Sequence, residues 1–111
     1  MFDSIVFHDV PGSDRRHRVL VLALSTCGFC RRGQDFLEKH QVAYQYIHLD
    51  SLDPEVKAQV KAEYKEKFGV SVSYPALVVD GTQQTIGYIK STWESLLGLS
   101  NEDEAESVVL E

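Results

Sequence analysis

The sequence predicts one small α/β domain, a mixed four-stranded sheet with helices on both faces. Strand-like and helix-like segments alternate in the order β-α-β-α-β-β-α, and the 111 residues suffice for a single hydrophobic core. Strands separated by a helix are expected to run parallel. The last two strands are separated only by the tight turn Asp80-Gly81, so we expect them to be antiparallel.

The first strand and the first helix are the clearest elements. Residues 18–25 are almost continuously apolar, which is typical of a central strand buried on both faces. Residues 28–40 then show helical spacing, with Gly33, Phe36 and Leu37 on one face. This face is expected to pack against the sheet.

A second strand and a second helix follow. Residues 43–49 alternate between apolar and polar side chains, which predicts a strand. Pro54 is expected to open the next helix, because proline is favoured at the first helical position. Asp53, just before it, is a residue type favoured as helix cap. Gly69 suits the C-terminal end of that helix.

The remaining segments predict a hairpin and a last short helix. Residues 75–79 and 85–89 are the third and fourth strands. The sequence from Ser91 to Glu94 matches a capping box, in which the two end side chains bond the helix backbone. The helix that it opens is expected to end near Gly98.

Three regions differ in composition. Residues 1–17 form an N-terminal arm, and the sequence leaves open whether this arm pairs as an edge strand. Residues 18–99 form the compact domain, and residues 100–111 form an acidic tail. Five of the six net negative charges of the chain lie in the last eleven residues. We interpret the tail as poorly ordered, with docking to a basic partner as the alternative.

Composition also excludes several functional classes. No apolar run approaches the roughly 18–20 residues of a membrane span, and the first residues lack the pattern of a secretory signal. There is no basic patch for nucleic acid. We therefore expect a cytoplasmic protein with no membrane or nucleic-acid partner. In a reducing cytoplasm, two close cysteines indicate catalysis more than a structural disulfide.

Cys27 and Cys30, the only cysteines of the chain, lie at the predicted junction between the first strand and the first helix. The unpaired N–H groups at a helix N-terminus favour an anion, and Arg31 and Arg32 add positive charge. Both effects favour the thiolate form of Cys27, which is the nucleophilic form of cysteine. The pattern predicts a dithiol redox site.

Two other interpretations of the cysteine pair remain. A structural zinc ion needs four ligands, but there is no second cysteine pair, and the four histidines (His8, His17, His40 and His48) have no ligand spacing. We therefore predict no metal site. Two inert buried thiols are the other alternative, although their position at a strand-to-helix turn does not suit it.

The order of elements and three motifs resemble those of the thioredoxin fold. Within that fold, residues 18–98 are similar to a glutaredoxin or a related small redoxin. The motifs are Ser25-Thr26-Cys27-Gly28-Phe29-Cys30, Ser73-Tyr74-Pro75 and Ile86-Gly87-Tyr88. The resemblance implies that Pro75 is cis, lies against Cys27 and presents the backbone of Tyr74 to an extended substrate. From the residues alone, an ordinary proline at the start of a strand is equally allowed.

The resemblance also implies an activity, the reduction of protein disulfides by thiol–disulfide exchange. Cys27 is then the nucleophile and Cys30 the resolving thiol. Most of the residues expected to contact the substrate lie in the three motifs. Of the other two, Arg31 directly follows the cysteine pair and Ser91 begins the predicted last helix. The full set is Gly28, Phe29, Arg31, Tyr74, Pro75, Gly87, Tyr88 and Ser91.

The chain departs from the glutaredoxin pattern at two positions that bear on the electron donor. Many glutaredoxins have a basic residue three positions before the first cysteine, where this chain has Leu24. They also often have Gly-Gly followed by Asp, where this chain has Gly87-Tyr88 and then Ser91. Two charge-assisted contacts to glutathione are missing, so we expect weak glutathione binding and no bound cofactor. Either glutathione or a thioredoxin-reductase-like donor would supply the electrons.

Two further functions compete with this one. Cys-Gly-Phe also begins the motif of glutaredoxins that carry a [2Fe–2S] cluster with glutathione, in which Cys27 would be the ligand. Cys30 in the fourth position and the missing glutathione contacts argue against it. The other competitor is an adaptor that docks through the arm or the tail. Trp93, Tyr74 and Tyr88 would form its contact surface, or they are ordinary packing residues.

Overall fold

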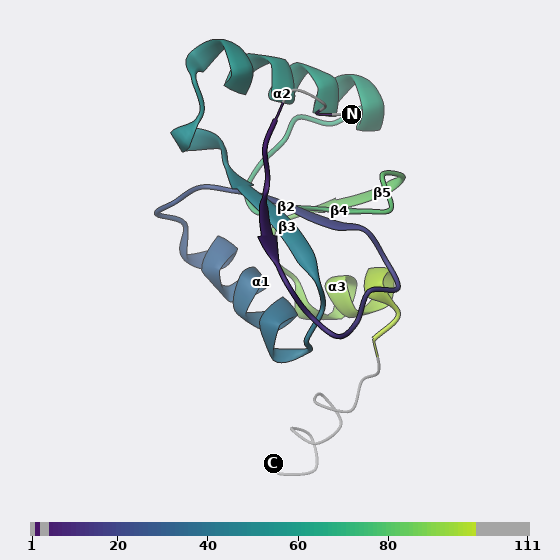
Figure 1. Cartoon of the computed structure of the whole chain (residues 1–111). Coiled ribbons are helices and arrows are strands. Elements are labelled where there is room, and N and C mark those ends of the chain that lie inside the picture. The colour runs from purple at the N-terminus through teal and green to yellow at the C-terminus, as the bar shows by residue number, and fades with distance from the viewer. Residues whose placement is uncertain (1, 3–4, 100–111) are drawn as a thin grey trace.

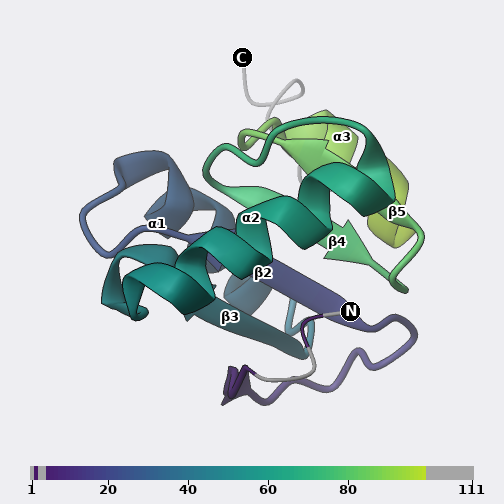
Figure 2. The same cartoon turned by 90° about the horizontal axis from the view of Figure 1, so that it is seen from above.

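The computed structural model describes residue 2 and residues 5–99 and has a mixed sheet between two layers of helices. Helix α2 covers one face of the sheet, whereas α1 and α3 cover the other (Figures 1 and 2). The elements are β1 (His8–Val10), β2 (Val19–Ala23), α1 (Gly28–Lys39), β3 (Tyr44–His48), α2 (Pro54–Phe68), β4 (Ala76–Val79), β5 (Gln83–Ile86) and α3 (Lys90–Leu97). This is the predicted thioredoxin-like α/β fold.

The strand order is β1-β3-β2-β4-β5, with β2 in the centre. β2 runs parallel to β3, where Leu22 lies beside Ile47, and antiparallel to β4, where Leu22 lies beside Ala76. β4 and β5 form the predicted antiparallel hairpin. The fourth strand ends at Ile86, three residues earlier than expected, because Gly87 leaves the strand with a φ of +83°.

The prediction of four strands is wrong, because the N-terminal arm supplies a fifth. β1 pairs antiparallel with β3, and His8 lies beside Tyr46. Further along the arm, the Asp14 N–H donates to the Gln41 carbonyl and the Ala43 N–H donates to the Asp14 carbonyl, both at 2.9 Å. Three largely exposed residues at a sheet edge show little alternation in sequence, so this strand has no clear signal.

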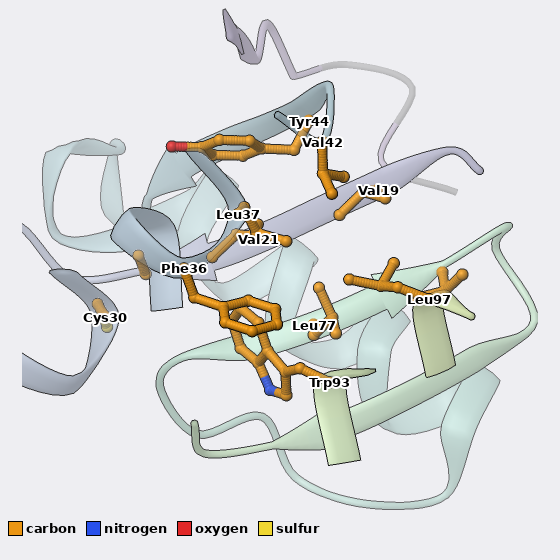
Figure 3. Close-up of a cluster of buried hydrophobic side chains, with 12 residues drawn as sticks. Val19, Val21, Cys30, Phe36, Leu37, Val42, Tyr44, Leu77, Trp93 and Leu97 are labelled. Carbon is orange, nitrogen blue, oxygen red and sulfur yellow. The ribbon is translucent and has the colours of Figure 1, made fainter. Parts of the chain in front are cut away.

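Two hydrophobic clusters lie on the two faces of the sheet. The cluster under α1 and α3 contains Cys30, Phe36 and Trp93, together with residues of β2 and β4 (Figure 3). The cluster under α2 contains Val60 and Tyr64. Both faces of β2 are therefore covered, as its continuous apolar run predicts.

The predicted helix ends are only partly correct. Pro54 opens α2, and Gly69 ends it with a φ of +75°, as expected, but Asp53 makes no side-chain cap bond. The capping box at Ser91 is wrong, because α3 begins at Lys90 and Ile89 stands at the cap position, two residues before Ser91. Ser91 is thus already inside the helix, and Glu94 is buried with 2% of its surface exposed.

Two expectations concern the ends of the chain and the membrane. Residues 100–111, the predicted acidic tail, lie outside the described residues, so the prediction that they are poorly ordered stays a prediction. Within residues 5–99, no helix combines the length and the apolar character that a bilayer crossing requires.

Gly33 gives the first testable prediction, because it sets the contact between α1 and α3. A Cβ atom at Gly33 would lie 2.5 Å from the Trp93 ring, whereas a Cβ at Gly28, on the same helix, would meet no atom within 4 Å. Gly33→Ala should lower the free energy of unfolding by about 1–3 kcal/mol, because the ring must shift. Urea unfolding measures this, with Gly28→Ala as the matched control. Equal stability of the two variants would contradict the packing argument.

Candidate active site

Cys27 stands at the N-cap of α1, just after the loop that leaves β2. The Cys30 N–H donates to the Cys27 sulfur at 3.2 Å, and the Arg31 N–H donates to the Cys27 carbonyl at 3.1 Å. The sulfur therefore accepts one of the N–H groups that a helix start leaves without a backbone partner. A thiolate at this position gains from that hydrogen bond and from the positive end of the helix dipole.

The two thiols differ in their surroundings. Cys27 is half-buried, whereas Cys30 has 1% of its surface exposed and belongs to the cluster under α1 and α3. Burial, and then the hydrogen bond with Cys27, raise the pKa of the Cys30 thiol to about 12. A molecule that approaches from solvent therefore reaches Cys27 first, and Cys30 lies behind it. Neither cysteine is in a disulfide.

Asp50 fixes the loop that carries Cys27. It lies in a short 3₁₀ turn, Leu49–Ser51, that follows β3. The Ser25 N–H donates to one carboxylate oxygen of Asp50 at 3.1 Å, and the Ser25 hydroxyl donates to the other. These bonds lower the pKa of the Asp50 carboxyl below its usual value. Sequence reasoning missed this residue, although parallel β2 and β3 bring their carboxyl ends to the same edge of the sheet.

The Tyr74–Pro75 peptide bond is cis, as the resemblance implies, whereas the position of Pro75 against Cys27 stays a prediction. The Gly87 N–H donates to the Pro75 carbonyl at 2.7 Å, and the Trp93 indole N–H donates to the Gly87 carbonyl at 3.1 Å. The loop before β4, the turn after β5 and helix α3 are therefore joined by two hydrogen bonds. The substrate-binding roles of Tyr74, Pro75 and Gly87 stay predictions.

The other predicted site residues are placed as follows. Phe29 has 60% of its surface exposed beside Cys27, with the Arg32 guanidinium 5.3 Å from the centre of its ring. Gly28 is exposed, and Ser91 is exposed on the first turn of α3. Tyr88 is half-buried and packs at right angles to Trp93, with 5.0 Å between ring centres.

The aromatic residues do not form one contact surface. Trp93 is completely buried, so it is a core residue rather than part of a docking surface. Tyr74 and Tyr88 are only partly buried and pack at the border of the core. The packing interpretation is therefore correct for Trp93.

A groove of about 300 Å³ runs from the thiols between α1 and β3. Cys27 and Cys30 lie in its wall with Arg31 of α1, and with Tyr46 and His48 of β3. No sequence motif marks the two β3 residues, so the sequence predicts no role for them. In the described part of the chain, no three His, Cys, Asp or Glu side chains gather closely enough to bind a metal ion.

Fold and site together define a thioredoxin-fold protein with a dithiol at the start of a helix. The family model for glutaredoxins matches residues 19–83. The chain therefore belongs to the glutaredoxin family, whose members are thiol–disulfide oxidoreductases that act on protein disulfides with glutathione or reductase donors. A search of curated protein sequences gives no significant match.

Solved structures share the fold. A glutaredoxin from Methanosarcina mazei Go1 has a TM-score of 0.73 and 22% identity, over 84% of this chain and 88% of that one. Methanoredoxin from Methanosarcina acetivorans has a TM-score of 0.73 and 24% identity, over 86% and 97%. The glutaredoxin grx-1 from Archaeoglobus fulgidus has a TM-score of 0.64 and 28% identity, over 74% and 87%.

The difference between the two thiols predicts selective alkylation. Iodoacetamide at neutral pH should modify Cys27 and leave Cys30 unmodified, because the raised pKa keeps Cys30 in its thiol form and burial restricts access. Selectivity should persist up to about pH 9, well below the pKa of Cys30. Mass spectrometry of the digested protein measures both sites. The urea-unfolded chain, in which both should react, is the control, and equal modification in the folded protein would contradict the assignment.

Proposed function

We propose that the protein reduces disulfides of other proteins by dithiol exchange, with Cys27 as nucleophile and Cys30 as resolving thiol. The observation that carries this proposal is the asymmetry of the pair. Cys27 is half-buried and accepts the Cys30 N–H, whereas Cys30 is buried behind it. A close cysteine pair at the start of a helix suits catalysis in a reducing compartment such as the cytoplasm.

The reaction has two steps. The Cys27 thiolate attacks a sulfur of the substrate disulfide, and a mixed disulfide forms while the other substrate sulfur leaves as a thiolate. Cys30 then loses its proton and attacks the Cys27 sulfur. The Cys27–Cys30 disulfide forms, the second substrate sulfur leaves with the electron pair, and both substrate sulfurs take up protons. The dithiol is oxidised and the substrate is reduced.

The substrate segment is proposed to bind along the loop before β4. There the backbone of Tyr74 precedes cis-Pro75, and an extended chain can add to it as a short strand. Exposed Phe29, two residues after Cys27, offers apolar contact, and exposed Gly28 leaves room for a close approach. Gly87, Tyr88, Ser91 and Arg31 complete the proposed surface.

For the electron donor we propose a thioredoxin-reductase-like protein rather than glutathione alone. Leu24 stands where a basic residue would meet a glutathione carboxylate, and it packs against the cluster under α2. At the other end, exposed Ser91 supplies a hydroxyl instead of a carboxylate for the amino group. Neither position supplies a charge opposite to that of the glutathione group it would meet, so glutathione should bind weakly.

Replacing each cysteine tests the dithiol scheme. Cys27→Ser should abolish disulfide reduction, because it removes the attacking sulfur. Cys30→Ser should retain the first step and accumulate the mixed disulfide, because the resolving thiol is missing. Insulin reduction and mass spectrometry of acid-quenched samples measure both effects. Undiminished insulin reduction by Cys30→Ser would refute the scheme, and matched circular dichroism spectra serve as the folding control.

The donor is tested by reducing the oxidised protein. The Cys27–Cys30 disulfide should be reduced slowly by millimolar glutathione and quickly by a thioredoxin reductase with NADPH. Quenched thiol trapping measures the fraction reduced over time. A glutaredoxin with a basic residue and an aspartate at the two positions is the control for glutathione. Rapid and complete reduction by glutathione would overturn the proposed donor but leave the dithiol function intact.

A further inference from the structure

The hydroxyl of Tyr74 is buried and has no hydrogen-bond partner among the described residues. Two other buried tyrosines differ from it, because the Tyr44 hydroxyl bonds Gln34 and Glu38, and the Tyr64 hydroxyl bonds Gln84. An unpaired buried hydroxyl destabilises a fold, so its presence calls for a reason. Local inconsistencies of this kind tend to occur at functional sites.

The position of Tyr74 supplies that reason. Tyr74 stands two residues before Ala76 of β4, and Ala76 lies beside Leu22 of β2, two residues before Leu24. Leu24 begins the loop that leads to the thiols. Tyr74 packs against both hydrophobic clusters, and one of these contains Cys30.

Electrostatics agree with this placement. Burial raises the pKa of the Tyr74 hydroxyl, and negative charge on Asp50 and on Cys30 raises it further. The hydroxyl therefore keeps its proton at neutral pH and can act only as a donor there or as a neutral acceptor. Asp50 already accepts two hydrogen bonds from Ser25. Of the two charges that act on Tyr74, the Cys30 thiolate is the one that forms during the proposed reaction.

The resolving step requires the thiolate form of Cys30, which a hydrogen-bond donor stabilises. With a pKa of about 12, the Cys30 thiol is almost entirely protonated at neutral pH, yet only its thiolate attacks the mixed disulfide. A hydrogen bond to a charged group is stronger than one to a neutral group. A donor beside Cys30 thus stabilises the thiolate more than the thiol and increases the reactive fraction.

We propose that the Tyr74 hydroxyl donates a hydrogen bond to the Cys30 thiolate and so accelerates resolution of the mixed disulfide; this role rests on the proposed dithiol function. Cys30 releases its proton to solvent, and its sulfur attacks the Cys27 sulfur. The Cys27–Cys30 bond forms, the Cys27–substrate bond breaks, and the substrate sulfur leaves with the electron pair. Tyr74 keeps its own proton throughout and touches only the attacking sulfur.

Ellman's disulfide, 5,5′-dithiobis(2-nitrobenzoate), separates the two steps in a stopped-flow experiment. Attack by Cys27 releases one yellow thionitrobenzoate at a rate that depends on reagent concentration. Attack by Cys30 releases a second thionitrobenzoate at a rate that is independent of reagent concentration. Thionitrobenzoate leaves as the anion and needs no proton. Tyr74→Phe removes only the hydroxyl. It should slow the second release by at least about tenfold and leave the first release unchanged.

Tyr64→Phe is the matched control, because it removes a buried hydroxyl on α2 instead. It should keep both release rates but melt at a lower temperature, since it loses the bond to Gln84. Tyr74→Phe should melt at or above the wild-type temperature, because it loses no bond.

Three results would overturn the role of Tyr74. If the second release is unchanged in Tyr74→Phe, the Tyr74 hydroxyl does not donate to the Cys30 thiolate. Equal slowing of both releases, with a lower melting temperature, would show a merely structural residue. A wild-type protein that releases only one thionitrobenzoate would overturn the dithiol function itself, and this role would fall with it.

Discussion

The buried indole of Trp93 is the contact on which the site depends. It lies against Gly33 of α1, where no side chain would fit, and packs edge-on against Phe36 (Figure 3). Its N–H bonds the Gly87 carbonyl, and the Gly87 N–H bonds the Pro75 carbonyl. One side chain thus holds together the helix that carries the thiols, the last helix and the loop of the cis proline. The three parts of the proposed active site have a fixed relation because they share this residue.

Burial gives two chemically identical side chains, Cys27 and Cys30, different properties. Both thiols lie within one helical turn, but the helix start leaves Cys27 half-buried and turns Cys30 into the core. The Cys30 N–H, in the first turn of the helix, bonds the Cys27 sulfur. Burial raises the pKa of the Cys30 thiol to about 12 and keeps it protonated at neutral pH. In the proposed exchange, the order of the two steps follows from this difference in depth.

The sequence predicts those features that follow from local pattern. The apolar run of β2, the helical face with Gly33 and the cysteine spacing suffice for the fold and for the thiols. The polar contacts depend on tertiary geometry and have no such signal. Asp50 reaches Ser25 only because two parallel strands end together, and Ser91 fails as a cap because the helix already starts at Lys90. The Tyr74 hydroxyl stands out because it is buried without a hydrogen-bond partner, and no sequence pattern predicts this.

The same packing bears on the choice of electron donor. Leu24 is half-buried and contributes to the cluster under α2, on the opposite face of the sheet from Trp93. A basic side chain at this position would gain a contact to glutathione but would lose that apolar contact and place a charge beside the core. The residue therefore serves the stability of the loop that carries the thiols. The proposed protein donor, which would contact exposed Phe29, needs no charge at this position.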